Sequence, residues 1–159
     1  MTIRIIPSGW LLQSMKTIQS LDHSEIKTVK ELLQLSSLPY SDISEAPVHF
    51  FGIKENNKLV AIGALEIYGI NAILRSLAVH QTHQNHGYGK QMVRFLENKA
   101  IEKGIKNLFL LTSTAADFFK KLAYLPQQRD LCPPEILSSS QFRDICPQSA
   151  SCLFKKLRN

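Results

Sequence analysis

The chain has 159 residues, 44% of them hydrophobic and 20% charged, and carries a formal net charge of +6. This length and composition exclude a disordered or fibrous protein and predict one folded domain over residues 15–159, preceded by an extension of residues 1–14. The positive charge suits an anionic ligand. Because the basic residues are dispersed and do not alternate with aromatic residues, we expect no nucleic-acid partner.

The three cysteines form no CxxC pair, so neither a disulfide framework nor a structural zinc site is indicated. No segment approaches the ~20 consecutive apolar residues of a membrane span, and the first residues lack the apolar core of a signal peptide. We therefore expect a cytoplasmic protein with no membrane partner and no metal. The sequence leaves a monomer and a homodimer equally open.

The first half of the chain predicts a strand, a helix and an antiparallel meander. A helix should begin after Asp22 or Ser24, either of which can cap it, and apolar residues at helical spacing follow. The non-periodic stretch 39–47 predicts a loop that forms part of an acceptor-binding wall. Asn56 and Asn57 lie in a polar hairpin turn, because asparagine tolerates left-handed geometry. The strands that we expect here are 17–21, 48–54, 59–68 and 72–79.

After residue 79 the hydrophobic period changes from two to about 3.6, which predicts an amphipathic helix closed by Gly104. Residues 108–112 are continuously apolar, as in a strand buried on both faces of a sheet. A short helix over 115–122, a helix over 140–145 and a last strand over 151–157 complete the pattern. This order is typical of an α/β (α+β) fold with a mixed sheet.

The loop from Gln84 to Gly89 predicts an anion site at the start of the long helix. The first N–H groups of a helix have no intrahelical partner, and the helix dipole adds positive potential there. Glycines at 87 and 89 let the backbone approach phosphate oxygens, and Lys90 adds charge. Neither a dinucleotide fingerprint nor a P-loop is present. Two glycines before a helix also occur in ordinary turns, so spacing alone does not decide.

The surrounding residues add a family resemblance. The segments 77–80 (LAVH), 84–89 (QNHGYG) and 110–112 (LLT) resemble motif A of the GCN5-related N-acetyltransferases (GNAT), and 116–124 (ADFFKKLAY) is similar to the family's later A-x-x-F-Y-x-x-x-G-F segment. Segments 66–69, 74–79, 111–115 and 142–152 are similar to the arsenic-operon branch of that family.

The resemblance implies a GNAT fold, whose mixed, mostly antiparallel sheet is splayed between two parallel strands, here 72–79 and 108–113. It also implies acetyl-CoA as the cosubstrate in that gap, and an N-acetyltransferase acting on a small-molecule amine, amino-acid-like or arsenic-related. The alternatives are a catalytically weak acyl-CoA-binding module and a protein N-terminal acetyltransferase. The residues placed on acetyl-CoA are Leu77, Ala78, Val79, Gln84, Asn85, His86, Gly87, Tyr88, Gly89, Lys90, Phe118 and Phe119.

The catalytic groups are less defined, because Phe119 stands where the family often has a tyrosine acid. Tyr124 is one substitute, with Tyr88 and water as others. Glu66 is the first candidate base, although a solvated strand residue is the competing interpretation. Arg75, amid apolar neighbours, should either grip an acceptor carboxylate or pair with Glu66.

Four further side chains are weaker candidates. His80 and His83 could act as bases, but surface histidines without a role are the simpler interpretation. Cys146 and Cys152 could bind trivalent arsenic, with inert buried thiols as the alternative.

Overall fold

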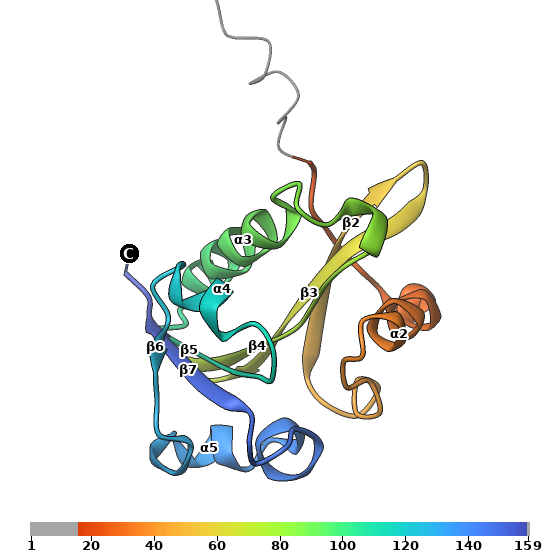
Figure 1. Cartoon of the computed structure of the whole chain (residues 1–159). Helices are drawn as coiled ribbons and strands as arrows, with labels where there is room; N and C mark the ends of the chain where they lie inside the picture. Colours follow the sequence, from red (N-terminus) through yellow and green to blue (C-terminus); the bar gives the residue numbers. More distant parts are fainter. Residues whose placement is uncertain (1–15, 159) are drawn as a thin grey trace, which may run out of the picture.

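The computed structural model describes residues 16–158, which form a seven-stranded mixed sheet flanked by helices (Figure 1). The expected extension, residues 1–14, lies outside this range. The strand order is β1-β2-β3-β4-β5-β7-β6, and only β4 and β5 pair in parallel. The strands are β1 Gln19–Ser20, β2 Val48–Glu55, β3 Lys58–Tyr68, β4 Asn71–Val79, β5 Asn107–Thr112, β6 Leu125–Pro126 and β7 Ser151–Lys156.

The helices follow the predicted order with small differences in length. They are α2 Ile26–Leu35, α3 Tyr88–Glu102, α4 Ala116–Lys120 and α5 Pro134–Leu137. Asp22 caps a 3-10 turn, His23–Glu25, that leads into α2. The helix expected over 115–122 is shorter, and the one expected over 140–145 is a π-helical turn, Gln141–Ile145. Within residues 16–158, no helix has the length and apolar content required to cross a membrane.

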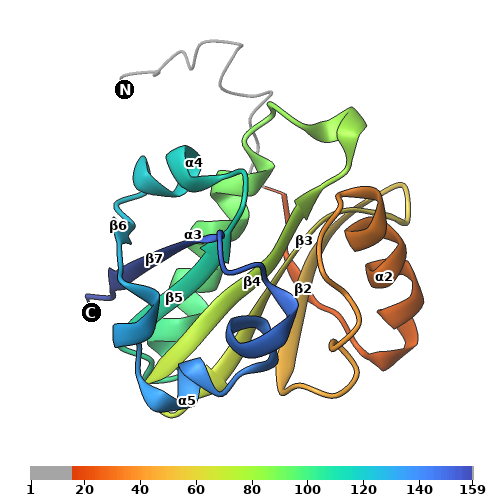
Figure 2. The same cartoon turned by 60° about the horizontal axis from the view of Figure 1, so that its bottom comes forward.

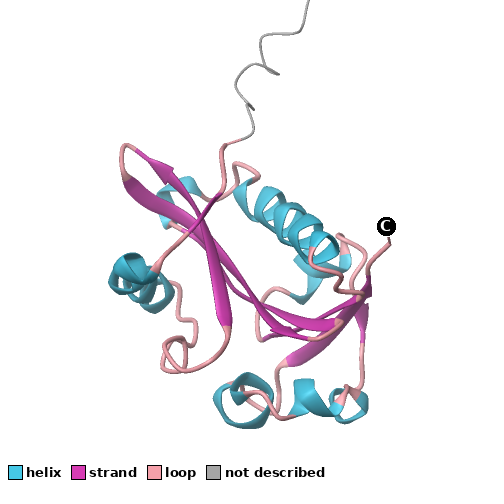
Figure 3. Cartoon of the chain, turned by 180° about the vertical axis from the view of Figure 1, so that it is seen from behind, coloured by secondary structure: helices cyan, strands magenta, loops and turns pink. Residues whose placement is uncertain are grey.

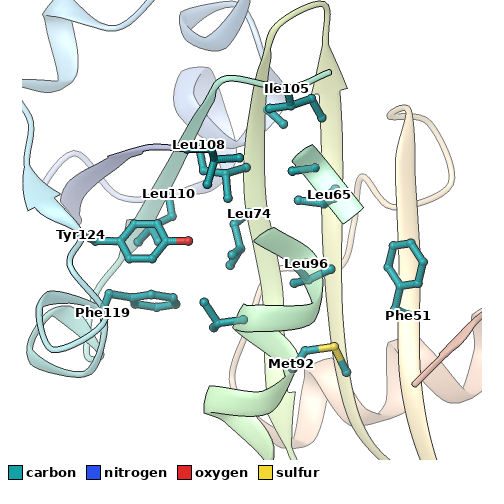
Figure 4. Close-up of a cluster of buried hydrophobic side chains, with 14 of the residues drawn as sticks. Phe51, Leu65, Leu74, Met92, Leu96, Ile105, Leu108, Leu110, Phe119 and Tyr124 are labelled. Carbon is teal, nitrogen blue, oxygen red and sulfur yellow. The ribbon is translucent and has the colours of Figure 1, made fainter. Parts of the chain in front are cut away.

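Helices cover both faces of the sheet, α3 on one and α2 on the other (Figures 1 and 3). The predicted apolar stripe of α3 is confirmed, because Met92, Val93, Leu96 and Ala100 are all buried. Figure 4 shows part of their cluster, with Leu96 from α3 and Leu65 from β3. On the opposite face Leu33 of α2 packs in a cluster with Phe50 and Ile62. Alternate strand residues face opposite sides, so β2, β3 and β4 each supply residues to both clusters.

The hairpin between β2 and β3 turns as predicted, since Asn56 and Asn57 have φ angles of 50° and 62°. Two consecutive left-handed residues make the tight turn whose twist matches that of the strands.

The sheet opens between its two parallel strands. β4 and β5 pair only from Asn71 with Asn107 to Ile73 with Phe109, and then diverge (Figure 2). On its other edge β4 carries a bulge. Ala64 and Ile62 of β3 are two residues apart, but their partners in β4, Arg75 and Ala78, are three residues apart. Ser76, in this bulge, has a φ of 58°. A bulge bends its strand and increases the local twist, which directs β4 away from β5.

Ala123 occupies a backbone conformation that favours glycine. Its φ is 71° where the chain leaves α4, and its N–H donates to Lys120 O at 3.1 Å. The family segment that residues 116–124 resemble has a glycine at this position. An alanine in the left-handed region is strained by ~1–2 kcal/mol, and glycine would relieve this strain. Glycine also raises the entropy of the unfolded chain, which offsets only part of that gain.

We predict that Ala123→Gly stabilises the fold by about 1 kcal/mol and raises the melting temperature by ~2–4 °C. Ala123 is exposed, so no packing is lost. The control is Ala116→Gly, at a helical position of α4, which should destabilise the protein by ~0.5–1 kcal/mol. Thermal and urea unfolding measure both variants, and equal destabilisation by the two would contradict the strain argument.

Candidate active site

A cleft of about 270 Å³ lies where β4 and β5 separate. Residues 74–79 of β4 form one wall, and residues 110–112 of β5 face them. The end of α2 and the start of α4 close the sides, through residues that include Ser36, Leu38, Thr114, Ala115 and Phe119. Beyond Ile73 and Phe109 the facing edges of β4 and β5 do not pair, so their backbone groups are available to an extended ligand.

One end of the cleft meets the N-terminus of α3. Gly87, with a φ of 82°, precedes the helix, and no side chain caps it. The first helical bond runs from Gln91 N–H to Gly87 O at 3.0 Å. In the described part of the chain, no backbone group accepts from the N–H groups of Tyr88, Gly89 and Lys90. Free donors at a helix N-terminus are the arrangement that an anion site requires.

The other residues expected on the cofactor surround this helix terminus. Gln84 lines the cleft, and its Nε2 donates to Val79 O at 3.1 Å, which ties the loop to the end of β4. A Cβ at Gly89 would lie 3.4 Å from the ring of Phe118, so α4 packs closely against the loop. Asn85, His86 and Lys90 are exposed. The structure thus brings the predicted set together around one end of the cleft.

Glu55, which the sequence indicated only as a turn residue, holds this loop. Its Oε1 accepts from the Tyr88 hydroxyl, its Oε2 lies 2.8 Å from His83 Nε2, and Lys16 Nζ lies 3.3 Å from Oε1. The hydrogen bonds from Tyr88 and His83 lower the pKa of Glu55 to about 2. The same contact raises the pKa of Tyr88 to about 12. Glu55 therefore stays ionised at neutral pH and links the β2–β3 hairpin to both sides of the glycine loop.

Arg75 is 3% exposed and lies between two carboxylates. Its Nη1 and Nη2 donate to Asp42 at 2.6 Å each, and Nη1 donates to Glu66 Oε2 at 3.1 Å. The expected alternative of pairing with Glu66 is confirmed, and Arg75 also borders the cleft. Burial alone would lower the pKa of Arg75, but Asp42 and Glu66 raise it. A guanidinium in this place is permanently charged, so it must keep its partners.

Three residues around Arg75 were not predicted from the sequence, namely Asp42, Ser140 and Gln141. Asp42 lies in the loop 39–47, and the Ser140 hydroxyl donates to its Oδ2. With its amide oxygen turned toward the guanidinium, Gln141 accepts from Nε and Nη2 of Arg75 at 3.3 Å. Burial opposes ionisation of Asp42, but the bonds from Arg75 and Ser140 keep its pKa below the usual value. The only sequence signal was that a buried arginine requires a carboxylate, and this does not identify which one.

Glu66 is fully buried and does not border the cleft. Besides Arg75, it accepts a hydrogen bond from the Tyr68 hydroxyl at 2.5 Å. A base that acts directly on a substrate would have to face the cleft, and Glu66 does not, because β3 places it behind Arg75. Any proton that it takes must pass through neighbouring groups or water.

Phe119 borders the cleft, and Tyr124 packs behind it with ring centroids 5.4 Å apart. Figure 4 shows the Tyr124 ring and hydroxyl among apolar side chains that include Leu74 and Leu110. Tyr124 is 1% exposed, and its hydroxyl has no hydrogen-bond partner among the described residues. Burial raises its pKa. Tyr124 is thus separated from the cleft by Phe119.

The two histidines and the cysteines that the sequence also suggested do not line the cleft. His80 and His83 each contact the Thr82 hydroxyl at 2.8 Å, next to the glycine loop. Cys152 is 3.7 Å from Cys132, sulfur to sulfur, and not paired with Cys146 as the arsenic hypothesis supposed. Among the residues described, no group of three metal-binding side chains converges.

Parts of this chain are similar in sequence to known proteins. An N-acetyltransferase from Chlorobaculum tepidum is 29% identical over 106 residues, which is 65% of this chain and 64% of that protein. An amino-acid acetyltransferase from Pseudomonas syringae pv. tomato is 28% identical over 106 residues, covering 64% of this chain and 24% of that one. This chain thus spans less than two thirds of the length of either relative.

Solved structures share the fold. N-acetylglutamate synthase from Neisseria gonorrhoeae, complexed with coenzyme A and L-arginine, matches 92% of this chain and 34% of its own, with a TM-score of 0.73 and 20% identity. Tetrahymena GCN5 matches 89% of this chain and 96% of its own, with a TM-score of 0.71 and 17% identity. The model of the acetyltransferase (GNAT) family matches residues 12–124. Fold, sequence match and the splayed cleft agree, and the chain belongs to the acetyltransferase (GNAT) family.

Proposed function

We propose that the protein transfers an acetyl group from acetyl-CoA to the amine of a small molecule. The observation that carries this proposal is the cleft between β4 and β5, which leads to the uncapped N-terminus of α3. A long, flexible thioester with a pyrophosphate fits both parts, since unpaired strand edges suit its amide-containing arm and free helix N–H groups suit its phosphates. Amine attack on a thioester held in this way gains chiefly from proximity.

In this proposal the arm of acetyl-CoA bonds to the backbone of Leu77 and Val79, beside Ala78. A backbone N–H near Val79 stabilises the oxyanion that develops when the amine attacks, a contact usually worth a few kcal/mol. The phenyl rings of Phe118 and Phe119 cover the cofactor from α4. The groups that hold the pyrophosphate are those from Gln84 to Lys90, namely Gln84, Asn85, His86, Gly87, Tyr88, Gly89 and Lys90.

The acceptor approaches the side of the cleft where Arg75 lies. Asp42 and Glu66 together outweigh the single charge of Arg75, which favours a cationic ammonium group over a free carboxylate beside them. Glu66, acting through water, is the proposed base that deprotonates the amine. The relatedness to amino-acid acetyltransferases supports an amino-acid-like acceptor, and the similarity to the arsenic-operon branch supports an arsenic-containing analogue of one.

A catalytically weak acyl-CoA-binding module is the second candidate. It is favoured by Phe119, which has no hydroxyl to protonate the leaving thiolate, and by the burial of Tyr124 behind it. Incubation with acetyl-CoA and a panel of amines separates the two. Free thiol should appear with at least one amino acid or arsenic-containing analogue. Thermal stabilisation by acetyl-CoA without thiol release for any amine or peptide would favour the binding module.

We predict that Gly87→Glu weakens acetyl-CoA binding about a hundredfold or more. The added carboxylate stands where the phosphates would bind, while its charge at a helix N-terminus offsets part of the strain at a φ of 82°. Gly104→Glu is the matched control, because Gly104 has a φ of 79° at the other end of the same helix. Calorimetry should find near-normal affinity for the control. Retained affinity in Gly87→Glu would refute the assignment of the loop.

We also predict that Glu55→Gln raises the KM for acetyl-CoA roughly three- to tenfold and leaves kcat within about twofold, because the amide is uncharged and has one accepting oxygen where the carboxylate has two for Tyr88 and His83. Glu55→Asp should also raise the KM for acetyl-CoA above that of the parent protein, since its carboxylate is one carbon shorter. Glu31→Gln, exposed on α2, is the control for charge alone. An unchanged KM in Glu55→Gln would show that the loop does not require this support.

A further inference from the structure

Cys132 and Cys152 form a buried pair of thiols that the proposed acetyl transfer does not use. Their sulfur atoms are 3.7 Å apart, although the residues are 20 positions apart in sequence. Cys132 follows the 3-10 turn Arg129–Leu131, and Cys152 lies in β7. They are 4% and 7% exposed, in a cluster with Ile73 and Phe109. An ordinary disulfide has sulfurs ~2.0 Å apart, so a closing movement of about 1.7 Å would join them.

The two thiols share one hydrogen bond, which either sulfur can donate. Arg129 lies nearby, and its charge acts to lower the pKa of both thiols, against the effect of burial. Arg129 is fixed by donating to Phe142 O at 2.6 Å and to Pro147 O at 2.7 Å. Either cysteine can therefore react first, and the other is then the thiol that resolves it.

The segment between the two cysteines supports the acceptor side of the cleft. It includes α5 and the π-helical turn, from which Ser140 and Gln141 contact Asp42 and Arg75. Cys152 itself pairs in register with Leu111, a residue of the cleft wall. A bond between Cys132 and Cys152 would close this segment into a loop anchored on β7.

We propose that Cys132 and Cys152 are a redox modification site, which a peroxide converts to a disulfide that fastens the acceptor-side segment to the sheet. The thiolate of one cysteine attacks one peroxide oxygen, the O–O bond breaks, and a sulfenic acid and water result. The thiol of the other cysteine then attacks the sulfenic sulfur, the S–S bond forms, and a second water leaves. Two thiols and one hydrogen peroxide thus give one disulfide and two waters. This inference does not depend on the proposed acetyl transfer.

The test treats the whole protein with hydrogen peroxide and maps disulfides by mass spectrometry of non-reduced peptides. We expect a Cys132–Cys152 linkage, a melting temperature raised by roughly 5–10 °C, and reversal by dithiothreitol. Cys146→Ser should behave as the parent does, whereas Cys132→Ser should lose both linkage and shift.

Two results would overturn the proposal. One is that peroxide oxidises Cys146 while Cys132 and Cys152 stay reduced. The other is that the dominant linkage joins Cys146 to either of the pair. The disulfide map of the parent protein tests the proposal without any variant, so the test does not depend on whether Cys132→Ser folds.

Discussion

The separation of β4 from β5 is the constraint on which the rest of the molecule depends. Three residues of each strand pair, the bulge around Ser76 then turns β4 away, and two strand edges are left with unpaired backbone groups. In a continuous sheet no cleft would exist and the start of α3 would face only solvent. Backbone groups left free in this way are costly unless a ligand or water satisfies them, so the gap in the sheet is the feature on which the proposed cofactor binding rests.

Buried charge organises the acceptor side of that cleft. Arg75 comes from the bulged strand, and its partners come from β3, from the loop after α2 and, through hydrogen bonds, from the π-helical turn. Removing one partner of such a network leaves an uncompensated charge in the interior, which usually costs 3–5 kcal/mol. The network therefore links β3, β4, the loop after α2 and the segment that begins at Ser140.

The glycine loop is held by several hydrogen bonds, whereas the cleft next to Phe119 has few groups that could transfer a proton. The glycine loop is supported twice, by Gln84 on Val79 and by Glu55 on Tyr88 and His83. By contrast, Phe119 offers no proton at the cleft, and Tyr124 keeps its hydroxyl among apolar neighbours. If the proposed function is correct, such a site relies on the position of the thioester, with little help from a general acid.

The sequence by itself determined the order of the elements, the apolar face of α3, the Asn56–Asn57 turn and the glycine loop before α3, because each rests on local spacing and local backbone geometry. It also indicated that Arg75 needs a carboxylate, since burial of a charge is costly whatever the fold. Only the tertiary structure decided that Asp42 pairs with Arg75 and that Glu66 lies behind it. It also decided that Glu55 bonds to the glycine loop and that Cys132 contacts Cys152. These are contacts between residues far apart in the chain, and their partners are selected by strand register and loop path, which no local pattern encodes.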